Sequence, residues 1–126
     1  MKIIAFIPAR AGSKGVPGKN KSIYYKYPLY KHALNVAREV SLFTDLVLST
    51  NDCDILQESF DDPRFSVSKR DESLSRDTSS ITDVVIDYLR SSLSFDEILS
   101  SIVVLLQPTS PIRFPHELKN IIQLLM

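Results

Sequence analysis

Residues 7–20, IPARAGSKGVPGKN, contain all three glycines of the chain and follow an apolar run, KIIAFI. Gly12, Gly15 and Gly18 stand three residues apart, so main-chain N–H groups can approach a ligand closely. The same stretch and the residue after it supply four cations, Arg10, Lys14, Lys19 and Lys21. These residues predict a loop that binds phosphate groups. The alternative is a basic surface turn in which the glycines provide only flexibility.

Two common phosphate-binding motifs do not match this stretch. The P-loop has four residues between its first glycine and Gly-Lys, followed by Ser or Thr, whereas five residues separate Gly12 from Gly18 and Asn20 follows Lys19. The dinucleotide fingerprint is G-x-G-x-x-G, and the spacing here is G-x-x-G-x-x-G. The pattern therefore argues against a Walker-type site and against a nicotinamide or flavin site.

Charge is distributed unevenly along the 126 residues, although 15 basic and 15 acidic side chains cancel. Residues 1–38 hold eight Lys or Arg and no acid, so the remaining 88 hold seven bases and 15 acids. A protein that binds a nucleic-acid duplex is more usually basic overall. The pattern favours a small polyanion such as a nucleoside triphosphate, and no nucleic-acid partner is expected.

The other candidate groups favour structural roles. Cys53 is the single cysteine, so it has no partner for an internal disulfide, and we expect it to be a small, semi-buried residue. Asp52 and Asp54 could form a metal pair, but both also suit the start of a helix. No signal peptide and no stretch that could span a membrane is visible, so we expect a cytoplasmic protein with no membrane partner.

The chain alternates strand-like and helix-like segments around these residues. Strands are expected at residues 2–7, 46–48, 65–67 and 102–106, and helices after Pro28, at 54–60, from Ile81 and from about Pro115. Asp77, Thr78 and Ser79 can cap the helix at Ile81, and residues 91–101 read as a polar connection. This order predicts one α/β domain over residues 1–126, a three-layer α/β/α Rossmann-like fold with a mainly parallel sheet. Residues 107–113 then follow a strand's carboxyl end, where such sheets bind ligands.

Four separated segments together resemble the acylneuraminate cytidylyltransferases, the CMP-sialic acid synthetase family, which includes enzymes for legionaminic and pseudaminic acids. They are IPARAGSKGVPGKN, LSTND at 48–52, the Arg70, Leu74 and Asp77 spacing in RDESLSRDTSS, and LLQPTSPIR at 105–113. The resemblance covers most of the chain, in the family's order. The GSKG segment also separates the chain from the related Kdo cytidylyltransferases.

The resemblance implies that the anomeric hydroxyl of a nine-carbon 2-keto sugar acid attacks the α-phosphate of CTP and releases pyrophosphate. It implies that Arg10, Lys14 and Lys19 hold the triphosphate as the catalytic cations. The substrate-binding positions that it implies are Ala9, Gly12 and Ser13 in the loop, Asn20 beside the α-phosphate, Arg70, Ser79 and Ser80 near the base and ribose, and Gln107 facing the sugar. Each has a structural alternative: Arg70 could pair with Asp71 or Glu72, the serines could only cap a helix, and Gln107 could satisfy the strand end.

The chain departs from the family pattern at two positions and in its length. Asp71 stands where the family usually has Pro, and Asn51 where it commonly has Asp. Family members continue well past the position that matches Met126, and that part includes the carboxylates for Mg²⁺, more of the sugar pocket and the dimerisation element. The resemblance therefore implies Mg²⁺ as cofactor with ligands absent from this chain, and weak or no activity of the chain alone.

Two alternatives stay open beside this interpretation: a non-catalytic, truncated nucleotide-binding module, and a nucleotidyltransferase for another base or sugar, such as legionaminic or pseudaminic acid. A sheet cut short would leave an unpaired edge and exposed apolar surface. We therefore expect self-association, or a homodimer.

Overall fold

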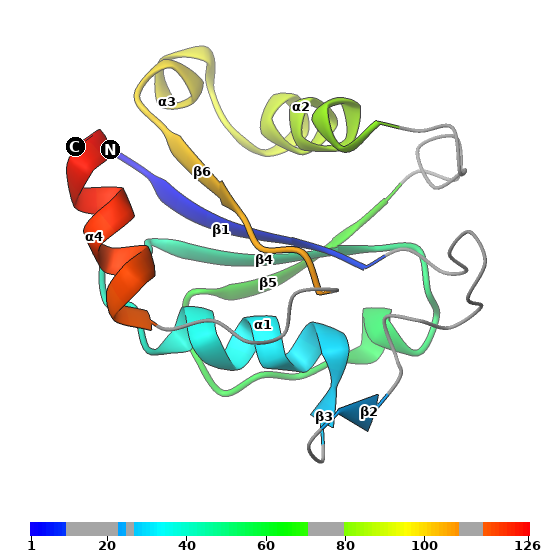
Figure 1. The fold of residues 1–126 in the computed structure, drawn as a ribbon. Coiled ribbons are helices and arrows are strands. Elements are labelled where there is room, and N and C mark those ends of the chain that lie inside the picture. Colours follow the sequence, from blue (N-terminus) through cyan, green and yellow to red (C-terminus); the bar gives the residue numbers. More distant parts are fainter. Residues whose placement is uncertain (10–22, 25–26, 71–79, 109–114) are drawn as a thin grey trace.

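The computed structural model describes residues 1–9, 23–24, 27–70, 80–108 and 115–126. A four-stranded parallel sheet forms its centre (Figure 1). The strands are β1 (Ile3–Pro8), β4 (Asp45–Thr50), β5 (Phe65–Lys69) and β6 (Ile102–Leu105), in the order β5-β4-β1-β6. The prediction of a mainly parallel sheet is confirmed, with the first apolar run in an inner position.

Alternate residues of β1 face opposite sides of the sheet, and all six are buried. Ile3, Ala5 and Ile7 join the larger core cluster, whereas Ile4 and Phe6 join the smaller one. Each face therefore needs its own cover, which explains why this strand is apolar without interruption.

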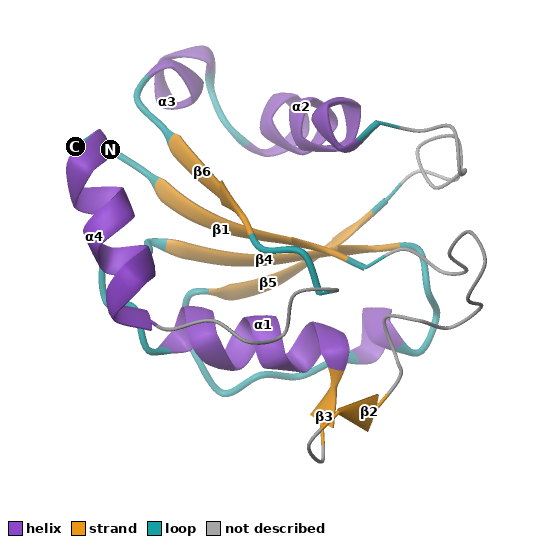
Figure 2. Cartoon of the chain, viewed as in Figure 1, coloured by secondary structure: helices purple, strands orange, loops and turns teal. Residues whose placement is uncertain are grey.

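Helices cover both faces and complete the three layers (Figure 2). α1 (Leu29–Arg38) and α4 (Pro115–Leu125) place buried residues in the larger cluster, and α2 (Ile81–Ser92) places Val84 in the smaller one. On the α2 side, the rings of Phe6 and Tyr88 lie 5.5 Å apart. The predicted α/β/α architecture is confirmed.

The start of α1 follows Pro28, as predicted, and Tyr30, Ala33, Leu34 and Ala37 form its buried face. Before it, β2 (Ile23–Tyr24) and β3 (Tyr27–Pro28) pair as a short antiparallel ribbon. Arg64, just before β5, donates to the backbone oxygens of Arg38, Val40 and Phe43 at and just beyond the end of α1. One side chain thus adds hydrogen bonds to three carbonyl groups at and beyond the end of α1.

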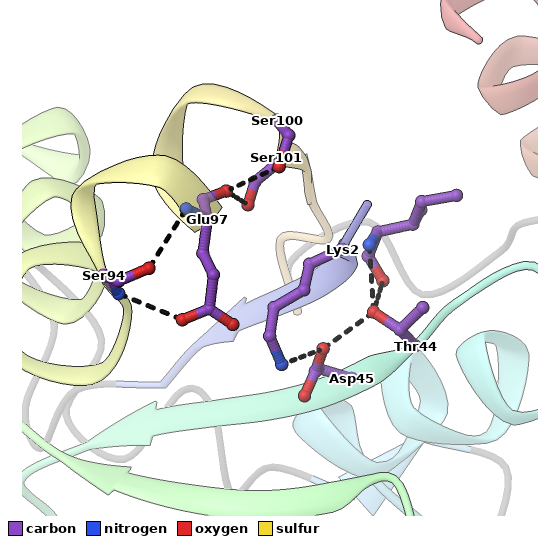
Figure 3. A network of polar contacts seen from close by, with 8 residues as sticks. Lys2, Thr44, Asp45, Ser94, Glu97, Ser100 and Ser101 are labelled. Carbon is purple, nitrogen blue, oxygen red and sulfur yellow. Dashed lines mark hydrogen bonds and ion pairs between the residues drawn. The ribbon is translucent and has the colours of Figure 1, made fainter.

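Two predicted segments differ in the structure. The helix expected at 54–60 is a single 3-10 turn, η2 (Ile55–Gln57), since Glu58 already has extended backbone angles. The stretch expected to be a polar connection contains α3 (Phe95–Leu99), which a capping box stabilises. There Ser94 Oγ accepts from the Glu97 N–H at 3.2 Å, and Glu97 Oε1 accepts from the Ser94 N–H at 3.0 Å (Figure 3).

A second group of polar contacts in Figure 3 joins the beginning of β1 to the beginning of β4. Thr44 Oγ1 accepts from the Ile3 N–H at 2.9 Å and donates to Asp45 Oδ2 at 2.7 Å, and Lys2 Nζ lies 3.4 Å from the same carboxylate oxygen (Figure 3). These contacts hold the amino edge of the sheet together.

Candidate active site

The carboxyl ends of all four strands lie along one edge of the sheet, because the strands are parallel (Figure 1). Ala9 follows β1, Asn51 follows β4, Arg70 follows β5, and Gln107 comes two residues after β6. Three predicted substrate-binding residues from separate parts of the sequence are thus brought to this edge.

Ala9 is fully buried, and its backbone N–H and its backbone oxygen both form hydrogen bonds with residues of β4. Its N–H donates to the Ser49 oxygen at 2.8 Å, and its own oxygen accepts from Thr50 Oγ1. The glycine-rich stretch therefore starts from a position that β4 holds in place.

Arg70 is 4% exposed, and its backbone N–H donates to the Thr50 oxygen at 2.8 Å. A guanidinium keeps its positive charge at every physiological pH, even when buried. The structure thus places a buried cation directly at the edge where ligands bind in sheets of this kind. Asp71 and Glu72, its possible partners in the structural alternative, lie outside the described residues.

Ser80 is the N-cap of α2: its Oγ accepts from the Asp83 N–H at 3.0 Å. Ser80 thus caps the helix, one position later than the caps expected at residues 77–79, which lie outside the described part. A serine hydroxyl that accepts one bond still has a proton to donate. Capping and ligand binding are therefore compatible at this position.

Asp52 and Asp54 lie at the turn that leads into η2. Asp52 is 9% exposed, and its Oδ1 accepts from the N–H groups of Asp54 at 2.9 Å and Ile55 at 3.4 Å. Asp54 is exposed, and no group of three His, Cys, Asp or Glu in the described ranges is arranged to hold a metal. The Asp52 carboxylate thus stabilises this turn. Cys53, expected to be semi-buried, is exposed.

The sequence of the chain also matches a known protein family. The sequence profile described as "Cytidylyltransferase" matches residues 4–126. The chain therefore belongs to the cytidylyltransferase family. That membership confirms the family resemblance found in the four segments.

Two curated cytidylyltransferase relatives align with nearly the whole chain. The CMP-N,N'-diacetyllegionaminic acid synthase of Legionella pneumophila is 37% identical over 124 residues, which are 98% of this chain and 53% of that protein. The N-acylneuraminate cytidylyltransferase of Streptococcus agalactiae serotype III is 35% identical over 122 residues, 95% of this chain and 28% of that protein. The chain thus spans about half or less of the length of these relatives.

A solved structure supports the cytidylyltransferase fold. The CMP:2-keto-3-deoxy-manno-octonic acid synthetase complexed with CTP superposes with a TM-score of 0.76 and 22% identity, over 98% of this chain and 46% of that one. In addition, no helix among the described residues is long and apolar enough to cross a membrane.

The remaining predicted site residues lie outside the described residues and stay predictions. They are Arg10, Gly12, Ser13, Lys14, Lys19, Asn20 and Ser79. Gln107 is described and half-buried; beside it, the Leu106 N–H donates to the Phe6 oxygen at 2.9 Å, which fixes the end of β6.

A polar cluster at the start of α1 was not predicted from the sequence. The Tyr30 hydroxyl donates to Glu58 Oε2 at 3.0 Å, and Lys31 Nζ lies 2.9 Å from Glu58 Oε1. Burial, and then the Glu58 carboxylate, raise the pKa of Tyr30 well above its usual value. No local pattern could have revealed the contact, because its partners lie 28 positions apart in the sequence.

Proposed function

We propose that this chain provides the nucleotide-binding part of an enzyme that transfers CMP from CTP to the anomeric hydroxyl of a nine-carbon 2-keto sugar acid of the sialic acid type, with release of pyrophosphate. The observation that carries the proposal is the family match over residues 4–126. The position of Ala9, Arg70 and Gln107 on the carboxyl edge supports it.

In the proposed reaction, the sugar oxygen attacks the α-phosphorus of CTP and loses its proton, while the bond to the α–β bridging oxygen breaks. Negative charge builds on the phosphate oxygens and on the leaving pyrophosphate, so positioned cations and N–H donors stabilise the transition state. We assign the triphosphate to Arg10, Lys14 and Lys19, with Ser13, Gly12 and Ala9 in the same loop and Asn20 beside the α-phosphate.

The nucleoside and the sugar are assigned to the rest of the edge. Arg70, Ser79 and Ser80 would bind near the base and ribose, and Gln107 would face the sugar. An acidic sugar is attracted by the same basic region, since residues 1–38 carry eight cations and no acid. N,N'-diacetyllegionaminic acid is the second candidate, because the Legionella relative with 37% identity carries that name.

Magnesium enters the proposal as a partner of the CTP phosphates, where it would neutralise charge. Its protein ligands are assigned, as the family resemblance implies, to carboxylates outside this chain. The cytoplasmic setting expected from the sequence is part of the same proposal.

Calorimetric titration of the 126-residue chain with CTP and Mg²⁺, with ATP and GTP as comparisons, tests the nucleotide site. The Arg10→Ala/Lys19→Ala variant removes two predicted phosphate ligands. Its matched control is Arg90→Ala/Lys119→Ala, which removes the same charge from exposed positions on α2 and α4.

We expect saturable binding that prefers CTP, is lost in the loop variant and is retained in the control. Equal binding of all three triphosphates would refute the assignment to CTP, and equal binding by both variants would refute the assignment to the loop. Saturable CTP binding would then justify a pyrophosphate-release assay with N-acetylneuraminic and N,N'-diacetyllegionaminic acid, in which the chain alone is expected to turn over weakly or not at all.

A further inference from the structure

A hollow of about 320 Å³ lies between α2 and α3. The two helices are neighbours on the face of the sheet opposite α1 (Figure 1). One face of each helix lines the hollow: Ile86, Leu89 and Arg90 from α2, and Phe95 and Ile98 from α3. Spacings of three and four residues place side chains on the same face of a helix. The lining is therefore apolar apart from one arginine.

Beside this hollow the chain exposes large apolar side chains. Phe95 is 73% exposed, and Leu99, one helical turn further on, is 70% exposed. Single apolar residues at a surface are common, but a projecting apolar pair next to an apolar hollow marks an interaction surface. We call this surface the α2–α3 patch; its apolar members are Ile86, Leu89, Phe95, Ile98 and Leu99.

The patch carries both halves of a contact between two copies of the chain. A two-fold axis brings the same surface of both copies together, so a projection on one copy must meet a hollow on the other. The Phe95 ring is such a projection. The hollow has room for it, since a cavity of about 150 Å³ already holds a benzene molecule. Exchange of the two Phe95 rings would therefore fill both hollows at once.

Charges at the rim of the patch are complementary in the same way. Arg90 lies on the α2 wall of the hollow, Asp96 follows Phe95 directly, and both charged side chains are exposed. Neither forms an ion pair with another described residue. A Phe95 ring seated in the hollow of the other copy carries its Asp96 towards Arg90 of that copy, and the two-fold axis forms this pair twice. The two opposite charges thus fit a second copy of this chain.

We propose that the α2–α3 patch is the contact between two copies of this chain, with Phe95 of each copy in the hollow of the other and Arg90 paired with Asp96 across the two-fold axis. The contact is a weak one, because few apolar side chains are buried and both ion pairs stay near solvent. α3 directly precedes the start of β6, so the patch lies away from the carboxyl edge of the sheet. The dimer leaves the candidate active site open, and the proposal does not depend on CTP binding.

Sedimentation velocity of the full chain, from low micromolar to near-millimolar concentration, tests the contact. Phe95→Ala removes the projection. Leu124→Ala is its matched control, since Leu124 is 86% exposed on α4, which packs on the opposite face of the sheet. We expect the dissociation constant of the dimer to rise about tenfold or more in Phe95→Ala and to stay within about twofold in Leu124→Ala. A wild-type chain that stays monomeric throughout this range, or an equal loss in the control, would overturn the proposal.

A mixing experiment separates a contact between copies from an effect within one chain. Arg90→Glu and Asp96→Arg each place like charges across the two-fold axis, so each variant alone should dimerise about fivefold more weakly than wild type. A mixture of the two variants restores opposite charges at both pairs, so heterodimers should form with an affinity close to that of wild type. A mixture that associates no better than the separate variants would refute the pairing of Arg90 with Asp96 and the two-fold contact with it.

Discussion

Replacing Arg64 by Met should measure how much the hydrogen bonds of one guanidinium stabilise the described fold. The Arg64 guanidinium donates to the oxygens of Val40 at 2.9 Å, Phe43 at 3.2 Å and Arg38 at 2.9 Å, and to Asp62 Oδ2 at 2.7 Å. Met keeps most of the aliphatic stem, so the change mainly removes charge and hydrogen bonds. The variant thus separates the guanidinium from the packing of its side chain.

The magnitude follows from the burial of each contact. The bonds to Val40 and Phe43 are partly buried, and each should contribute about 1 kcal/mol to the free energy of unfolding. The bond to Arg38 is exposed, so water replaces it at little cost. The Asp62 side chain, 8% exposed, would lose its ionic partner, which adds about 1–2 kcal/mol after allowance for solvent. The sum is about 3 kcal/mol, or a fall in Tm of about 10 °C.

Urea unfolding followed by circular dichroism at neutral pH measures the loss. The matched control is Arg90→Met on α2, where the arginine is exposed and the change should stay within about 0.5 kcal/mol. A loss below about 1 kcal/mol in Arg64→Met would refute the reasoning.

Acid titration of stability gives a second readout. The hydrogen bond from Arg64 to the Asp62 carboxylate lowers the pKa of Asp62 from 3.8 to about 2. Because the folded state then binds its proton less readily than the unfolded state, this contribution is complete above about pH 4 and is lost as pH falls towards 2. Arg64→Met should lose stability less steeply over that range, and an acid limb identical to that of wild type would contradict this prediction.

Two further changes probe the region around α3. Ser94→Ala removes the side-chain half of the capping box and should cost about 1 kcal/mol in urea unfolding, whereas Ser94→Asp, which keeps a capping oxygen, should cost less; equal losses would show that the cap contributes little. Phe95 and Leu99 are 73% and 70% exposed, so we expect the chain to self-associate at high concentration. The Phe95→Asp/Leu99→Asp variant should then show a lower apparent mass than wild type in light scattering. A wild-type monomer at every concentration would contradict that expectation.

Short-range patterns predicted most of the elements, because their causes are local. An uninterrupted apolar run gave β1, and helical spacing after Pro28 gave α1. The helix at 54–60 was wrong because Asp52 closes a tight turn there and the chain is extended again at Glu58. The α3 helix was missed because its serines resemble a linker until the Ser94 and Glu97 side chains are seen to cap each other's backbone.

Some features of the candidate site likewise follow from the sequence, and others only from the structure. The glycine spacing, the cations around it and the family of the chain follow from the order of residues alone. Only the tertiary structure shows that Ala9 and Arg70 are both tied to Thr50, and that Glu58 holds Tyr30. The pairs that Ala9 forms with Thr50 and Tyr30 forms with Glu58 join residues 41 and 28 positions apart. Such contacts depend on how parallel strands and their connections pack, which no local pattern encodes.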